Sequence, residues 1–158
     1  MQVSMFSGTE PLKITKKIRL IELFAGIGSQ AKALKNIGAD FEHYRICEFD
    51  KYAVTAYNAI HGTDFPVSDF TKWHAADLGI TEKDKYEYIM TYSFPCTDLS
   101  LAGNKKGMAK GSSTRSGLLL EVERILEECD GNLPQILLME NVDAILFEKN
   151  RKHFFQWC

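Results

Sequence analysis

The sequence predicts an α/β fold in which helices cover a doubly wound parallel sheet. Three observations support this prediction. Apolar runs typical of strands alternate with helix-like segments along most of the 158 residues, which is the pattern of βαβ units. Each helix-like segment is followed by a glycine or a polar turn. Three motifs, at residues 24–28, 93–96 and 139–142, directly follow strand-like runs. Because parallel sheets bind ligands beyond the carboxyl ends of their strands, we expect a site where these motifs meet.

The first half of the chain is expected to contain three strands and two helices. The strands are predicted at residues 18–23, 43–49 and 65–70. A helix starting at Ser29 has apolar residues three positions apart and ends at Gly38. A second helix, over residues 52–60, ends at Gly62. Glycine is the usual residue just past a helix end.

The second half is expected to add two strands and a helix. Residues 71–85 are polar and irregular, with at most one short helix. Residues 103–116 hold four Lys or Arg, three Gly and no acid, which is typical of a flexible loop. The strands are predicted at 86–92 and 135–139, the helix at 117–129, and a further helix begins near Asn150. The apolar run 135–139 is typical of a strand buried on both faces.

The composition is that of an ordinary globular domain, with 45% hydrophobic and 25% charged residues. Residues 1–17 lack periodicity and are expected to form a mobile tail, with a single domain over 18–158. No apolar run approaches the roughly 18 residues that span a bilayer, and no signal-peptide pattern is present. We therefore expect a cytoplasmic protein without membrane contact. A net charge of −2 means that any nucleic-acid contact must come from a local basic patch.

The four cysteines are unpaired in sequence. No CxxC motif occurs, and no His lies at zinc-ligand spacing from Cys47, Cys96, Cys129 or Cys158. Reduced thiols are therefore favoured over a disulfide framework or a structural zinc, and no metal is expected.

The glycine-containing turn at residues 24–28 favours an adenosine cofactor. Its glycines allow a tight turn and close approach of a ligand to the backbone. Glu48 follows 20 residues after Gly28, the spacing at which an acid binds ribose hydroxyls. This pattern leaves S-adenosylmethionine and NAD both open. Asp69 either accepts a hydrogen bond from an adenine amino group or caps a turn, and Phe24 packs on the cofactor or in the core.

A thiol and an acid follow two later strands. Cys96 comes after Pro95, which fixes the backbone, on a loop where a nucleophile would be accessible, whereas Cys47 inside a strand is expected to be inert. Glu140 ends the apolar strand 135–139 and is either catalytic or part of a structural ion pair. If the two strands are neighbours, Cys96 and Glu140 stand about 5 Å apart in sheet spacing. Asn141 either orients the acid or the backbone, or is a turn residue.

Together these motifs resemble one family. Phe24-Ala25-Gly26-Ile27-Gly28, Glu48-Phe49-Asp50-Lys51-Tyr52-Ala53, Phe94-Pro95-Cys96 and Glu140-Asn141-Val142 are similar, in order and spacing, to the DNA (cytosine-5)-methyltransferases. The segments at residues 103–108 and 115–118 are similar as well. The resemblance runs from Ile18 to the end of the chain and favours S-adenosylmethionine, with S-adenosylhomocysteine as product, over NAD. It implies an S-adenosylmethionine-dependent, Rossmann-like catalytic domain over 18–158.

The resemblance also implies roles for individual residues. Cys96 would add to C6 of a cytosine flipped out of double-stranded DNA, with a protonated Glu140 at N3 and with Pro95 and Asn141 beside them. The implied cofactor residues are Phe24, Gly26, Ile27, Gly28, Glu48, Phe49, Asp69, Phe70, Ser93, Pro95 and Leu118. The implied DNA-binding residues, which otherwise serve surface solubility, are Ser100, Lys105, Lys106, Lys110 and Arg115.

The chain departs from the family in two respects. Thr97 and Asp98 replace residues that the family often has as Gln and a small or apolar residue. The family's later Gln-Arg-Arg-like segment, target-recognition domain and last strands have no counterpart. Strand 135–139 would then be an apolar sheet edge, open to a complementing C-terminal chain or to self-association. We therefore expect weak cofactor binding and little or no methylation by this chain alone. The alternatives are a non-catalytic partner module, a subunit of a split methyltransferase, or an NAD-type oxidoreductase fragment.

Overall fold

A computed structural model describes residues 13–94 and 118–146. Its sheet contains four strands, β1 (Lys17–Leu23), β2 (Phe41–Cys47), β3 (Tyr86–Tyr92) and β4 (Ile136–Met139). The strand order is β2-β1-β3-β4 and all three pairings are parallel. This confirms the α/β fold with a parallel sheet. The basic segment 103–116, the further helix near Asn150 and most of the N-terminal tail lie outside the described residues.

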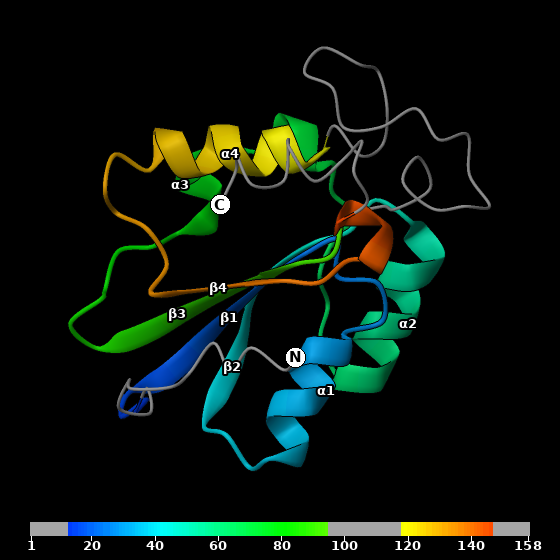
Figure 1. The fold of residues 1–158 in the computed structure, drawn as a ribbon. Coiled ribbons are helices and arrows are strands. Elements are labelled where there is room, and N and C mark those ends of the chain that lie inside the picture. The colour runs from blue at the N-terminus through cyan, green and yellow to red at the C-terminus, as the bar shows by residue number, and fades with distance from the viewer. Residues whose placement is uncertain (1–12, 95–117, 147–158) are drawn as a thin grey trace, which may run out of the picture.

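Helices cover both faces of the sheet. In Figure 1, α1 (Ser29–Asn36) and α2 (Lys51–His61) lie on one side of the strands, and α3 (Ala75–Leu78) and α4 (Leu118–Glu128) on the other. Two short 3₁₀ helices, η1 (Phe70–Lys72) and η3 (Asp143–Leu146), complete the described elements. No helix in this described part is long and apolar enough to cross a membrane.

Alternation along β1 divides the core between the two faces. Ile21 and Leu23 pack in a cluster with the buried face of α4, while Ile18 and Leu20 pack with Ala31 of α1. Successive strand residues point to opposite faces, so a central strand that is covered on both sides must be apolar at nearly every position. Lys17 and Arg19, at the start of β1, are exposed and half-buried, whereas Glu22 is the one charged residue of β1 that is fully buried.

The glycine predicted to end the second helix is confirmed, and the structure adds the N-cap of that helix. Asp50 caps α2 by accepting a 2.8 Å hydrogen bond from the Tyr52 N–H. Gly62 then ends the helix in the left-handed conformation with φ of 68°, and its N–H donates to the Asn58 carbonyl at 2.8 Å. These are the capping arrangements that sequence patterns predict most directly.

The strand predicted at 65–70 is absent. The Asn58 side chain binds both backbone groups of Phe65, donating to its carbonyl at 2.9 Å and accepting from its N–H at 3.0 Å. Pro66 has no N–H, and Asp69 already begins η1. Phe65 and Pro66 are therefore not free to begin a strand ladder. The segment makes one backbone bond to the end of β2, from the Ser68 N–H to the Glu48 carbonyl at 2.9 Å.

The prediction that strand 135–139 is buried on both faces is also wrong. Leu137 and Leu138 are 41% and 53% exposed, and among the described residues β4 pairs with β3 alone. An apolar sequence does not distinguish a strand covered on both faces from one at a sheet edge. The edge position is the one that the family resemblance implied.

The strand register aligns the four carboxyl ends in one row. The paired residues at the ends of β2, β1, β3 and β4 are Cys47, Leu23, Tyr92 and Met139. The residues that follow them are Glu48, Phe24, Ser93 and Glu140. Backbone hydrogen bonds extend the row, since the Phe24 N–H donates to the Cys47 carbonyl at 2.7 Å and the Glu140 N–H to the Tyr92 carbonyl at 3.2 Å.

The α4 face of the core gives a direct test of this packing. Ile125 is fully buried in the cluster beneath α4, so Ile125→Ala should lower the free energy of unfolding by about 2–5 kcal/mol in a urea titration. Ile37→Ala, at a residue that is 78% exposed, is the matched control and should change it by less than about 0.5 kcal/mol. Equal effects of the two substitutions would contradict the described core.

Candidate active site

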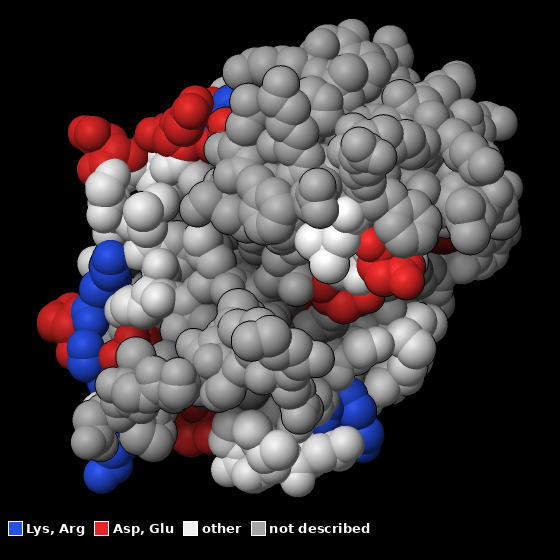
Figure 2. All heavy atoms as spheres, in the orientation of Figure 1, with Lys and Arg blue, Asp and Glu red and all other residues white. Residues whose placement is uncertain are grey.

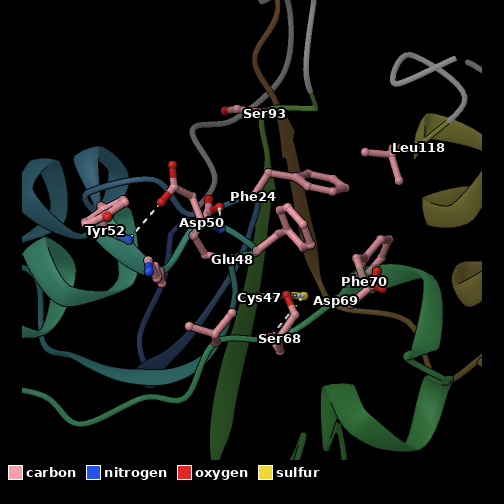
Figure 3. A pocket seen from close by; sticks show the side chains of 13 residues that line it. Phe24, Cys47, Glu48, Asp50, Tyr52, Ser68, Asp69, Phe70, Ser93 and Leu118 are labelled. Atoms are coloured by element: carbon pink, nitrogen blue, oxygen red, sulfur yellow. Dashed lines mark hydrogen bonds between the residues drawn. The ribbon is translucent and has the colours of Figure 1, made fainter.

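A cavity of about 910 Å³ opens at the carboxyl ends of the strands (Figure 3). Its volume is within the range of small-molecule sites, roughly 300–1,000 Å³. Seven of the residues predicted to bind a cofactor line it: Phe24, Glu48, Phe49, Asp69, Phe70, Ser93 and Leu118. They come from segments that are far apart in the sequence and meet because the strand ends are aligned.

The glycine turn runs through left-handed backbone conformations. Phe24, Gly26 and Gly28 have φ of 55°, 53° and 81°. A Cβ on Gly26 would meet open space, so glycine is favoured there by its φ alone. A Cβ on Gly28 would lie 2.3 Å from Nε2 of His61. Gly26, Ile27 and Gly28 are not among the residues that line the cavity, so the turn shapes the site from behind its wall.

Glu48 connects this turn to the start of α2. One carboxylate oxygen, Oε2, accepts from the Gly26 N–H at 2.9 Å, and the other, Oε1, accepts from the Asp50 N–H at 2.8 Å. Each oxygen has further lone pairs, so the carboxylate still has acceptor capacity for hydroxyl groups in the cavity. The two backbone bonds fix the direction in which those lone pairs point.

Asp69 has the capping role that the sequence allowed, and it has this role at the cavity wall. Its carboxylate accepts from the Thr71 N–H at 3.1 Å and from the Thr71 hydroxyl at 2.8 Å, which begins η1. These Thr71 hydrogen bonds lower the pKa of Asp69. The same residue also lines the cavity. It is therefore an ionised capping residue at the cavity wall.

Aromatic rings form the apolar part of the wall. Phe24 meets Phe70 edge to face with centroids 5.2 Å apart, and Phe70 is buried in the core. Phe24 therefore packs against the core and lines the cavity. Phe49 and Tyr52, by contrast, are 76% and 74% exposed where they line it. Large exposed rings beside a cavity commonly mark a ligand site.

Ser93 and Asn141, which follow β3 and β4, are both hydrogen-bonded to neighbouring segments. The Oγ of Ser93 accepts a 3.3 Å hydrogen bond from the Gln30 side chain at the start of α1. Asn141 donates from Nδ2 to the Phe94 carbonyl at 2.8 Å, and its Oδ1 accepts from the Val142 N–H at 3.0 Å. Asn141 thus holds the backbone at Phe94, two residues before Cys96 in the sequence, and the neighbouring Glu140 is exposed.

Several predicted residues lie outside the described part of the chain. These are Pro95, Cys96, Ser100, Lys105, Lys106, Lys110 and Arg115. On the face in Figure 2, Lys and Arg of the described residues are interspersed with Asp and Glu. That described face therefore carries no continuous basic surface.

Sequence reasoning missed six residues that line the cavity: Cys47, Asp50, Lys51, Tyr52, Val67 and Ser68. Three of these lie within the Glu48–Ala53 motif, so the motif itself was the available signal. Val67 and Ser68 were obscured by the incorrect strand at 65–70. Cys47 was taken as inert filling, and it is 1% exposed although it borders the cavity.

The cavity suits an adenosine-type ligand. Aromatic and aliphatic side chains can cover a purine, and the Glu48 and Asp69 carboxylates can accept from ribose hydroxyls and an exocyclic amine. No group of three or more His, Cys, Asp or Glu able to hold a metal occurs among the residues described.

Comparison with known proteins assigns the family. A sequence model of the C-5 cytosine-specific DNA methylases matches residues 18–158. The chain belongs to this family. The orphan methyltransferase M.SssI of Spiroplasma monobiae is 35% identical over 90% of the chain and 51% of its own length. The type II methyltransferase M.NlaX of Neisseria lactamica is 39% identical over 80% of the chain and 37% of its own length.

The solved structures agree in fold. The S. pombe Dnmt2 methyltransferase superposes with a TM-score of 0.68 at 23% identity, over 90% of this chain and 40% of that one. A putative DNA modification methyltransferase from an E. coli prophage superposes with a TM-score of 0.62 at 21% identity, over 89% of this chain and 37% of that one. The chain spans about half, or less, of the length of these relatives.

Thiol reactivity tests the burial of Cys47. Burial raises the pKa of the Cys47 thiol to about 12, so only about one ten-thousandth is thiolate, the reactive form, at pH 8. We expect iodoacetamide at pH 8 to leave Cys47 unmodified in the native protein and to modify it in denaturant, as read by peptide mass spectrometry. Rapid native labelling of Cys47 would contradict its described burial.

Proposed function

We propose that this chain supplies the cofactor-binding and nucleophile-bearing part of an enzyme that methylates C5 of cytosine in double-stranded DNA. The observation that supports this most directly is the aligned row of Glu48, Phe24, Ser93 and Glu140, in a chain of the C-5 cytosine-specific DNA methylase family. The first three of these residues line the cavity, and Glu140 ends the neighbouring strand. The cavity accommodates the cofactor, and the ends of β3 and β4 border the place for the base.

The cofactor half uses Glu48, Asp69 and the aromatic wall. S-adenosylmethionine would provide an electrophilic methyl group on a sulfonium sulfur. Glu48 accepts from the ribose hydroxyls, with its carboxylate already oriented by the Gly26 and Asp50 N–H groups. Asp69 accepts from the adenine amino group, while Phe24, Phe49, Phe70 and Leu118 cover the purine and Ser93 lies at the methyl end.

The catalytic half uses Cys96 and Glu140. The Cys96 thiolate forms a bond to C6 of the flipped cytosine, and the electron pair of the C5–C6 double bond becomes available at C5. Glu140, protonated and hydrogen-bonded to N3, stabilises the charge that develops on the ring. C5 accepts the methyl group, loses its proton to a base, and re-forms the double bond as the thiolate leaves.

Neighbouring residues position this chemistry. Pro95 restricts the backbone before the nucleophile, and Asn141 holds the Phe94 carbonyl through its 2.8 Å hydrogen bond. That bond supports a backbone-orienting role for Asn141. Ser100, Lys105, Lys106, Lys110 and Arg115 would contact DNA phosphates in a segment that closes over the substrate.

The edge of the sheet supports a requirement for a companion chain. β4 presents two exposed leucines, Leu137 and Leu138, and in the described structure it pairs on one side. Exposed apolar edges pair readily with further strands. A complementing chain that carries the later segments of the family would cover this edge. Activity of this chain alone would then be weak or absent, and a non-catalytic, cofactor-binding partner role is the second candidate.

Cofactor identity can be tested by calorimetry. S-adenosylhomocysteine should bind the chain and NAD should not. Glu48→Gln should weaken that binding about tenfold or more, because hydrogen bonds to a charged acceptor contribute more than neutral ones. Glu127→Gln, an exposed acid on α4 away from the cavity, is the matched control. Tighter binding of NAD than of S-adenosylhomocysteine would refute the proposed cofactor.

The nucleophile can be tested by covalent trapping. A duplex containing 5-fluorocytosine should become attached to the chain in the presence of S-adenosylmethionine, because the fluorine blocks loss from C5. Cys96→Ser should abolish the adduct, and Cys129→Ser should preserve it. Failure to trap even with a complementing C-terminal chain present would rule out the catalytic role and favour the partner module.

A further inference from the structure

A partly buried polar network lies beneath the glycine turn, on the face of the sheet that α1 and α2 cover. It consists of Glu22 from β1, His43 from β2, and Tyr57 and His61 from α2. Glu22 and Tyr57 are 1% and 0% exposed. The proposed chemistry uses none of these four residues, and none lines the cavity. Buried polar groups of this kind are costly unless they are fully hydrogen-bonded, so their partners define what they do.

Glu22 substitutes for a missing helix cap. The N-cap residue of α1 is Gly28, which has no side chain to accept from the first turn. Oε1 of Glu22 instead accepts from the Ala31 N–H at 3.1 Å. The carboxylate lies at the positive end of the helix dipole, where negative charge is favourable. The cap of α1 therefore comes from β1, and the backbone between the two, residues 24–28, is held at both ends.

Tyr57 and His43 complete the coordination of this carboxylate. The Tyr57 hydroxyl donates to Oε2 of Glu22 at 2.5 Å. A hydroxyl has one proton, so the 2.7 Å contact between Nδ1 of His43 and the Tyr57 oxygen requires the histidine N–H as donor. Burial raises the pKa of Glu22, and the Tyr57 and Ala31 hydrogen bonds act in the opposite direction. Burial also lowers the pKa of His43, in agreement with a neutral ring that carries its proton on Nδ1.

His61 connects the network to the turn itself. Its Nε2 lies 3.0 Å from the carbonyl oxygen of Ile27, which can only accept, so Nε2 carries the proton. The ring lies against Tyr57, with centroids 4.5 Å apart. Both rings fill the space that a Cβ on Gly28 would need, at 2.3 Å for His61 and 2.6 Å for Tyr57. The last residue of α2 thus supports the middle of the glycine turn.

The two sides of the turn are therefore fixed by different groups. On the cavity side, the Gly26 N–H donates to Glu48. On the side that faces α2, the Ile27 carbonyl accepts from His61. Within the described turn, residues 24–28, one backbone hydrogen bond is made, from the Gly28 N–H to the Ala25 carbonyl at 2.9 Å. A segment with positive φ at three of five residues has little intrinsic preference for this shape, so side-chain contacts must select it.

We propose that Glu22, Tyr57 and His61 are positioning residues that hold the glycine turn in the conformation in which the Gly26 N–H orients Glu48, the residue proposed to bind the cofactor. The identity of that cofactor rests on the proposed function; the effect on the turn does not. Their role is to set cofactor affinity through the backbone of residues 26–28 without contacting the ligand.

The turn can be observed directly by amide hydrogen exchange in the ligand-free chain. His61→Ala removes the bond to Ile27 and should speed exchange at Gly26 and Gly28 by about three- to tenfold, the range that one net hydrogen bond accounts for. His61→Gln places an amide N–H near the same carbonyl and should restore most of the protection. His74→Ala, at an exposed histidine that caps α3, is the control and should leave these amides unchanged.

The same variants should separate affinity from stability. S-adenosylhomocysteine should bind His61→Ala about three- to tenfold more weakly than the parent chain, with most of the affinity recovered in His61→Gln. Tyr57→Phe should weaken the binding of S-adenosylhomocysteine. Tyr44→Phe is the control: it removes a comparable hydrogen bond, 2.8 Å to the Gly79 carbonyl, and should leave this binding unchanged. Melting temperatures of the two tyrosine variants provide the check that each has folded.

Two results would overturn the proposal. One is unchanged exchange at Gly26 and Gly28 in both His61→Ala and Tyr57→Phe. The other is equal loss of protection in His61→Ala and His61→Gln, which would assign the effect to ring packing and not to the bond. If the parent chain does not bind S-adenosylhomocysteine, the proposed function fails, while the exchange data still decide whether the network positions the turn.

Discussion

The register of the parallel strands is the constraint on which the site depends. Because Cys47, Leu23, Tyr92 and Met139 are paired across the sheet, the four residues that follow them emerge side by side. Two of these residues are carboxylates and one is an aromatic ring. The outermost two in the sequence, Phe24 and Glu140, are 140 − 24 = 116 positions apart. A shift of one residue in any pairing would turn the corresponding side chain toward the opposite face. Sheet pairing, and not local sequence, therefore assembles the cavity.

The glycine turn lies behind the cavity wall and orients Glu48, which lines the cavity. Gly26 and Gly28 are required for different reasons, one for its φ and the other also for the closeness of His61. Glu48 receives the Gly26 N–H on the cavity side, while Glu22 caps α1 on the buried side. Two acids of adjacent strands thus fix one short turn from its two sides. A half-exposed acid at the cavity wall, Glu48, and a buried acid, Glu22, therefore shape the same backbone.

Local patterns predicted much of this fold. The strand at 86–92 and the glycines that end α1 and α2 follow from apolar runs and from turn chemistry, and both are confirmed. The strand at 65–70 was predicted wrongly because Asn58 binds the Phe65 backbone, a side-chain contact that no periodicity reveals. The exposure of β4 depends on its place in the sheet. Likewise, nothing in the sequence around Tyr57 or His61 indicates that they support a turn some 30 residues earlier. Their contacts are set by how α2 packs on the sheet.

A crystal structure of the chain with S-adenosylhomocysteine tests the central claim most directly. We expect the adenosine inside the cavity, with ribose hydroxyls on the Glu48 carboxylate and the purine between the Phe49 and Phe70 side chains. The sulfur should point toward Ser93, at the end of β3. A ligand seated elsewhere, or one in the cavity with its ribose turned away from Glu48, would contradict the account.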